Sequence, residues 1–151
     1  MNVSGEFIID APRERVFNAI KDARFFASCI DGVQDLTEVD PTHYDAVFET
    51  KVAYLKFRFK VTVEITKLQE PDEIEAKVEG TPLGIVGRLT ATSRTKLTAD
   101  GDRTKVDYSA EAALTGKLGS LGQPVLKSKA KQMEKQFAER LQAAFAEGRA
   151  P

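Results

Sequence analysis

Few residues in this chain have the types and spacing that catalysis requires. His43 is the only histidine and lies at a predicted turn before Tyr44, so we expect it to be exposed rather than paired with a nucleophile. Cys29 is the only cysteine, and its apolar neighbours predict a small buried side chain rather than a reactive thiol. The chain has no CxxC or HxxxH spacing and no phosphate-binding glycine loop, so neither a metal site nor a nucleotide site is predicted.

The carboxylates do not form a recognisable acid–base pair. Glu73, Glu75 and Glu79 alternate with apolar residues, which predicts that they face solvent from a strand. With no carboxylate pair directed to the predicted interior, we expect a protein that is not an enzyme. A polyketide-cyclase-like enzyme is the alternative, and it requires a polar group such as Tyr108, Tyr44 or Ser93 inside the fold.

Composition excludes several other classes of protein. The 151 residues include 22 basic and 23 acidic side chains, and no basic run is interleaved with aromatic residues, so nucleic-acid binding is not expected. The first residues lack the cationic and apolar regions of a signal peptide, and no apolar run approaches the ~20 residues that span a bilayer. We expect a single domain over residues 1–151, located in the cytoplasm.

The elements that position these residues are mostly strands followed by one long helix. Residues 116–148 carry apolar side chains every three or four positions, which predicts a helix with one apolar stripe. Earlier, residues 3–9 form a predicted strand, Pro12 opens a short helix, and residues 22–29 form another. Further strands are predicted over residues 33–39, 44–52, 55–65, 74–80, 89–97 and 106–114.

This order predicts an α+β fold. We expect a curved antiparallel sheet of six to seven strands wrapped around the long C-terminal helix, with the two short helices closing one end. The clearest alternation, over residues 55–65, places apolar side chains on one face and charged ones on the other.

The predicted inner face mixes bulky and small residues, which leaves two interpretations open. Small residues allow the helix to pack closely on the sheet, or they leave an apolar pocket of roughly 300–1,000 Å³. Glycines at positions 80, 84 and 87 favour the pocket, because glycine in a strand often marks a bend. The predicted lining consists of Phe48, Phe57, Phe59, Val61, Ala76, Val78, Leu89, Ala91, Tyr108, Ala110, Leu126, Ala130, Met133 and Phe137.

A portal is predicted at one end of this pocket. Gly116, Gly119 and Gly122 precede Pro124, and each glycine costs roughly 1 kcal/mol in a helix relative to alanine. Pro124 either begins the regular helix or kinks a longer one. A weak helix start opposite the apolar loop 81–85 predicts an opening, and ordinary helix and loop ends are the alternative. The portal residues would be Pro82, Leu83, Gly84, Gly119 and Gly122.

Two segments carry a resemblance to a known family. The first contains Ala11-Pro12, Val16-Phe17, Asp22 and Cys29-Ile30-Asp31-Gly32-Val33. The second contains Gly116-Lys117-Leu118, Leu121-Gly122, Ala130-Lys131 and Gln136-Phe137. Together they resemble the carbon monoxide dehydrogenase G-subunit family of the START-like (SRPBCC) superfamily. The chain departs from the family pattern at Asp31, where the family has proline, and at Pro124, where it has a helix former.

The resemblance implies a helix-grip fold around a deep hydrophobic cavity and an accessory role beside a molybdenum hydroxylase of the carbon monoxide dehydrogenase type. It also implies a link to membrane attachment, at the inner face of the membrane, and to the handling of a quinone. We therefore expect a non-enzymatic binding or carrier protein for a hydrophobic small molecule, with no cofactor apart from a bound quinone or lipid and at most peripheral membrane contact. The runner-up is an assembly or membrane-recruitment factor for such a dehydrogenase that acts through its surface.

Overall fold

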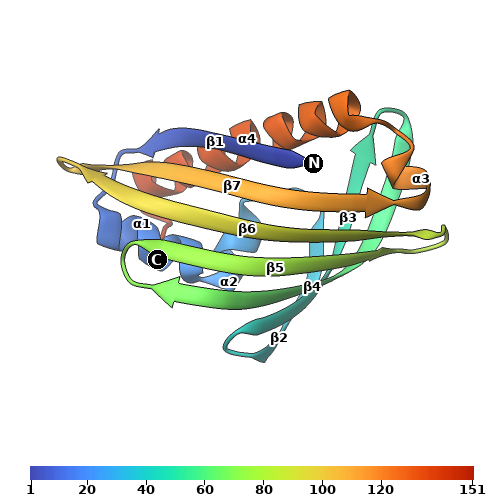
Figure 1. Ribbon diagram of the computed structural model, residues 1–151. Coiled ribbons are helices and arrows are strands. Elements are labelled where there is room, and N and C mark those ends of the chain that lie inside the picture. The colour runs from blue at the N-terminus through green and yellow to red at the C-terminus, as the bar shows by residue number, and fades with distance from the viewer.

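The computed structural model describes residues 1–151 as one seven-stranded antiparallel sheet with four helices (Figure 1). The strands are β1 (Asn2–Ile9), β2 (Val33–Asp40), β3 (His43–Val52), β4 (Leu55–Gln69), β5 (Glu73–Pro82), β6 (Gly87–Asp100) and β7 (Arg103–Thr115). The helices are α1 (Arg13–Lys21), α2 (Ala23–Ser28), α3 (Gly116–Gly119) and α4 (Gln123–Ala146). The predicted α+β fold, with a curved sheet and a long C-terminal helix, is confirmed.

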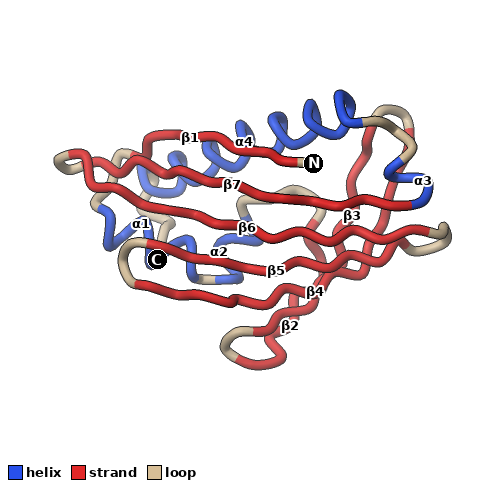
Figure 2. The backbone as a smooth tube through the Cα atoms, viewed as in Figure 1, coloured by secondary structure: helices blue, strands red, loops and turns tan.

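The strand order is β1-β7-β6-β5-β4-β3-β2, so β1 joins the sheet beside the last strand. Figure 2 shows the sheet curving, with α4 lying along β1 and α1 and α2 gathered at one end. The alternation predicted for residues 55–65 holds, and β4 continues to Gln69 beyond an irregular register between Ile65 and Lys67. That irregularity shifts the alternation, which explains why the sequence pattern ends at Ile65.

The long helical pattern is divided into two helices. Gly122 has a φ of +90° and lies between α3 and α4, and Pro124 occupies the first turn of α4. Proline fits there because the first turn has no intrahelical partner for its missing N–H. Pro124 therefore begins the regular helix, as one of the two predicted alternatives stated. At 24 residues, α4 is about 36 Å long.

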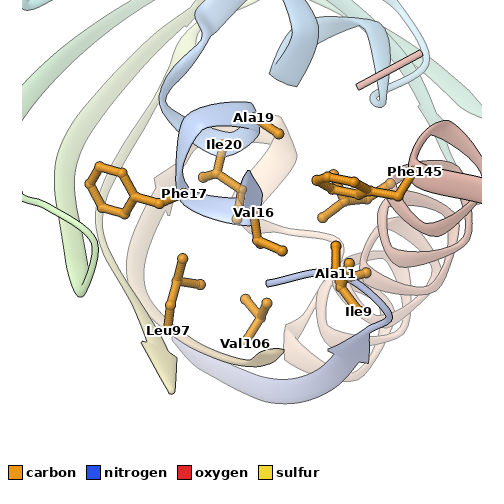
Figure 3. Close-up of a cluster of buried hydrophobic side chains, with 10 residues drawn as sticks. Ile9, Ala11, Val16, Phe17, Ala19, Ile20, Leu97, Val106 and Phe145 are labelled. Atoms are coloured by element: carbon orange, nitrogen blue, oxygen red, sulfur yellow. The ribbon is translucent and has the colours of Figure 1, made fainter. Parts of the chain in front are cut away.

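One buried cluster packs the end of the molecule that holds α1, and we call it the α1 cluster (Figure 3). It consists of Ile9, Ala11, Val16, Phe17, Ala19, Ile20, Leu97, Val106, Leu141 and Phe145. The buried hydroxyl of Thr104 donates to the backbone oxygen of Ala11 at 2.7 Å, so the strand-to-helix turn is tied to β7. This end joins the last turns of α4 to the sheet.

A second buried cluster, the α3 cluster, lies at the other end of α4. It consists of Val52, Phe57, Phe59, Leu118 and Leu126. Leu126 and Leu141 are 15 positions apart on α4, which is about 22 Å along the helix axis. The helix is thus packed firmly at both ends, and its middle turns lie between the two clusters.

The two edges of the sheet differ. Beside β1, the Lys131 ammonium of α4 donates to the backbone oxygen of Ser4 at 2.9 Å, so the helix covers this edge. The β2 edge pairs with β3 in a register that shifts twice, between Gln34 and Thr37 and between Glu38 and Asp40. In Figure 1 the long helix α4 does not run along this edge, and the short helix α2 contacts β2.

Asp31, the residue that departs from the family pattern, links α4 to the turn before β2. Gln136 donates to Oδ2 of Asp31 at 2.7 Å, and the Arg140 guanidinium forms an ion pair with Oδ1 at 2.5 Å. Arg140 also lowers the pKa of Asp31. The aspartate thus provides a polar contact to α4 that a proline could not make.

Candidate functional site

The inner face of the sheet between the two clusters is apolar and only half-buried. Ala76, Val78, Leu89, Ala91 and Ala110 lie on it from the middle strands, and all remain in contact with solvent. Ala130 and Met133 of α4 are half-buried as well. Residues of this kind at the centre of a packed core would be fully buried, so water reaches the space between sheet and helix. We call this region the open interior.

Other predicted lining residues form the ends of the open interior. Phe57, Phe59 and Leu126 are buried in the α3 cluster, with Phe48 and Val61 packed against it. Phe48 and Phe57 each place their rings about 6 Å from that of Phe59. At the other end, Phe137 packs against the α1 cluster and its ring lies 4.9 Å from that of Phe26. The sequence therefore predicted one continuous lining where the structure has a half-buried middle between packed ends.

The segments predicted to form a portal do meet, and packed side chains fill the contact. Ile85, in the loop after β5, packs against the α3 cluster that contains Leu118. Pro82 is buried, Leu83 and Gly84 are exposed, and Gly119 and Gly122 are half-buried. In this conformation the loop and the helix start form a closed contact, so a portal here would require them to separate.

Two of the glycines at the helix start allow close packing of backbone. A Cβ on Gly116 would lie 2.2 Å from the backbone oxygen of Val86, and one on Gly119 would lie 2.5 Å from that of Leu114. Neither distance is possible for real atoms, so these glycines let α3 lie directly against the neighbouring backbone. Their spacing, from which we predicted a weak helix, is explained by this contact.

The inner wall also carries polar groups. Tyr108 and Ser93 lie on the inner face of β7 and β6 and are half-buried. The polar inner group that a polyketide-cyclase-like enzyme would require is thus present. Burial and the neighbouring Glu134 carboxylate raise the pKa of Tyr108. Tyr44 is at the β2–β3 turn, where its hydroxyl donates to the Pro41 oxygen at 3.1 Å.

Glu134 was missed by the sequence reasoning, which placed it on the solvent face of the long helix. Its side chain is only 16% exposed. A Cβ built on Gly5 would lie 2.2 Å from Oε1 of Glu134 and 2.9 Å from the Tyr108 ring. Gly5 alternates inward on β1, so the carboxylate occupies the space that a side chain would otherwise fill on the inner face. The only signal in the sequence was a glycine inside an alternating strand.

His43, Cys29 and Glu73 were also considered as candidate site residues, and each lies in a different environment. His43 is exposed and forms an ion pair with Asp40 at 2.8 Å, which raises the pKa of His43 and lowers that of Asp40 to about 2. Cys29 is buried as predicted, and burial raises the pKa of its thiol. Glu73, predicted to face solvent, is buried between Arg94 and Lys67, so that prediction was wrong.

Two hollows of about 610 and 350 Å³ lie on the outer face of the sheet rather than between sheet and helix. Their walls are mainly polar side chains that alternate away from α4, such as Ser4 and Thr92 in the larger and Asp45 and Lys60 in the smaller. The larger hollow also borders the strand positions Ala76, Ser93 and Ala110, whose side chains alternate to the inner face. The polar lining of the two hollows does not suit the apolar ligand predicted from the sequence.

The structure contains neither a metal-binding cluster of side chains nor a membrane-spanning helix. No group of three or more His, Cys, Asp or Glu side chains is arranged to hold a metal ion. None of the four helices combines the length and the apolar character needed to cross a bilayer.

Several solved structures share this fold. A conserved protein from Geobacillus kaustophilus superposes with a TM-score of 0.89 at 24% sequence identity, over 97% of this chain and 96% of that one. A START superfamily protein from Mycobacterium smegmatis gives a TM-score of 0.70 at 12% identity, with 94% of each chain covered. A protein from Thermus thermophilus gives 0.66 at 19% identity, over 95% of this chain and 99% of that one. These likenesses show that the fold is the START-like helix-grip fold.

Sequence comparison adds the family. No curated protein sequence matches the chain. The sequence profile of the carbon monoxide dehydrogenase G-subunit (CoxG) matches residues 5–146, which is nearly the whole chain. That range contains both segments on which the resemblance was based. The chain therefore belongs to the carbon monoxide dehydrogenase G-subunit (CoxG) family.

Proposed function

We propose that this protein is a non-enzymatic carrier that holds a hydrophobic small molecule, a quinone or a lipid-like compound, between its sheet and α4. The observation that supports this is the open interior, where Val78, Ala91, Ala110 and Met133 are apolar and still in contact with solvent. Removing apolar surface from water contributes roughly 25 cal/mol per Å². These side chains are still in contact with water in the folded protein. A ligand that covers them would remove this apolar surface from water, and that burial would stabilise the complex.

We further propose that the carrier is accessory to a molybdenum hydroxylase of the carbon monoxide dehydrogenase type. Membership of the CoxG family supports this partner. The family and the fold together support a ligand-binding accessory protein. Pull-down from the native host with the purified chain as bait would test the partner, and recovery of no such dehydrogenase would contradict it.

The binding site can be tested by filling the interior. Protein purified from its native host would be examined by native mass spectrometry and by solvent extraction, and we expect a co-purifying apolar molecule. Ala110→Phe places a ring in the open interior and should abolish that molecule. Ala113→Phe is the matched control, because Ala113 faces outward on the same strand and is exposed. Equal retention of the molecule by both variants would contradict an interior site.

A second candidate function, membrane recruitment, is favoured by the surface at the α3 end. Four large apolar side chains are exposed there on loops and on the start of α4: Tyr54, Leu83, Val86 and Val125. Exposed lysines that form no ion pair lie nearby in sequence: Lys51 near the end of β3, Lys117 in α3 and Lys127 in the first turns of α4. Exposed apolar side chains accompanied by lysines suit the surface of an anionic bilayer. We call this the α3-end surface.

A further inference from the structure

Glu134 brings a carboxylate to the inner wall, which is otherwise uncharged and mostly apolar. It lies on α4 between the inward positions Ala130 and Phe137, and it points to the gap that Gly5 leaves on β1. Figure 1 shows α4 running beside β1, which is the arrangement that this contact needs. A carboxylate that is largely removed from water is costly unless it is paired, so its partners decide what it can do.

The two oxygens of Glu134 have different surroundings. Oε2 lies 3.3 Å from the ammonium of Lys131, which is 62% exposed and approaches from the solvent side. Oε1 is the atom that faces Gly5 and the Tyr108 ring on the inner side. Lys131 is itself held by the Ser4 backbone oxygen at 2.9 Å, so the ion pair fixes the carboxylate in place. One oxygen is thus held from the solvent side, and the other lies on the inner side of the sheet against Gly5 and beside the Tyr108 ring.

The chemistry of this pair selects one kind of ligand group. A carboxylate only accepts hydrogen bonds, and a tyrosine hydroxyl that donates to it leaves lone pairs of its own exposed. An O–H of a ligand can donate to such a site. A ketone or ether oxygen would instead bring its lone pairs against those of the carboxylate. Ligand sites are commonly apolar with a few polar groups that fix orientation.

We propose that Glu134, with Tyr108 beside it, forms the polar end of the ligand site and selects apolar molecules that carry a hydroxyl group. This inference rests on the proposed carrier function and narrows its ligand: a quinone, whose oxygens are ketones, is disfavoured, and its reduced quinol or a lipid-like compound with a hydroxyl group is favoured. The apolar body lies along the open interior, and its hydroxyl donates to Oε1 of Glu134.

Two probes that differ by a single methyl group test this selectivity. 2-Naphthol and 2-methoxynaphthalene share the same apolar ring system, but only the first has an O–H to donate. Because hydrogen bonds to charged groups are the strong ones, we expect the protein to bind 2-naphthol about tenfold more tightly. Equilibrium dialysis gives both dissociation constants, and this comparison needs no variant.

Variants then assign the preference to one side chain. Glu134→Gln should reduce the ratio of the two dissociation constants to roughly threefold or less, since a neutral amide is a weaker acceptor. Binding of 2-methoxynaphthalene should stay within about twofold of the wild-type value, since the interior keeps its volume. Glu139→Gln makes the same chemical change at an exposed position of α4 and should leave the ratio unchanged. Circular dichroism checks that each variant is folded, and Glu134→Leu serves as a second variant if Glu134→Gln is not.

The outcomes separate this inference from the carrier function. A preference for 2-naphthol that is lost with Glu134 supports both. Equal binding of the two probes by the wild type, or a preference that persists without Glu134, overturns the inference and leaves the carrier function standing. If the wild type binds neither probe, the apolar site itself is contradicted and the inference fails with it.

Discussion

Glu73 shows how a single residue depends on its neighbours in the sheet. It begins β5 with its side chain 8% exposed, 3.1 Å from the Lys67 ammonium and paired with Arg94. Hydrogen bonds from Arg94 and then Lys67 lower the pKa of Glu73 from its ordinary value of 4.5. Because the folded state lowers this pKa, the charged pair stabilises the fold above pH 4.5. That contribution is lost as the pH falls through the lower folded value.

We therefore expect Glu73→Gln to lower the melting temperature at pH 7, and the difference from the wild type to shrink as the pH falls below about 4.5. Thermal unfolding followed by circular dichroism between pH 3 and pH 7 measures it. Glu79→Gln is the control, since Glu79 is 59% exposed beside Arg88 and exposed ion pairs contribute little. A difference that does not change with pH would show that the charge of Glu73 is not the cause.

Glu73 and Glu134 mark the limit of what alternation and helical periodicity could predict for single residues. Both patterns assign a side chain to a face, and they assigned both glutamates to solvent. Burial of Glu73 depends on Arg94 and Lys67 meeting it from neighbouring strands. Burial of Glu134 depends on the missing side chain of Gly5, which is 129 positions away in sequence. Pairings of this range are set by the folded sheet and leave no local signal.

At the level of elements, the sequence predicted more. Apolar residues at every second position predicted the strands, and apolar residues at every third or fourth position predicted the helices. Both periods follow directly from backbone geometry. The division of the last helix was open, since Pro124 fits either a helix start or a kink. Gly122 decides it, because its φ of +90° and ψ of 152° are essentially restricted to glycine.

Gly122→Ala should destabilise the protein by about 1–3 kcal/mol, the usual cost of forcing such a conformation on a residue with a side chain. A Cβ there would meet only Pro124, at 3.9 Å, so backbone strain rather than a clash is the cause. Urea unfolding measures the change. Ser128→Ala, at an exposed position inside α4, should cost nothing, and an equal loss in both variants would argue against the strain.

The ends and the middle of α4 should contribute differently to the stability of the protein. Leu141 is completely buried in the α1 cluster, so Leu141→Ala should cost about 2–5 kcal/mol. Met133 is half-buried in the open interior, where truncation leaves no closed cavity, and Met133→Ala should cost clearly less. Denaturant unfolding of the two variants compares them. Equal costs would mean that the middle of the molecule is as tightly packed as its ends.

For the whole molecule, the membrane proposal predicts that the two ends behave differently at a bilayer. The chain has no tryptophan, so one introduced residue is a unique fluorescent reporter. With vesicles containing an anionic phospholipid, Val86→Trp on the α3-end surface should show a blue-shifted emission that weakens at high salt. Leu68→Trp, at the opposite end of β4, should show no shift. The same shift at both positions, or none at Val86→Trp, would contradict recruitment through this surface.

The way in which the two edges of the sheet are covered affects the tendency of the protein to aggregate at high concentration. An exposed edge strand offers unpaired backbone groups to any neighbouring chain and is a common starting point for aggregation. Here α4 and Lys131 cover the β1 edge, while β2 combines two register shifts with Asp35, Glu38 and Asp40. Irregular register and repeated negative charge both oppose pairing with a second copy. We therefore expect the protein to resist strand-to-strand polymerisation at high concentration, even though the apolar side chains between sheet and helix remain in contact with solvent.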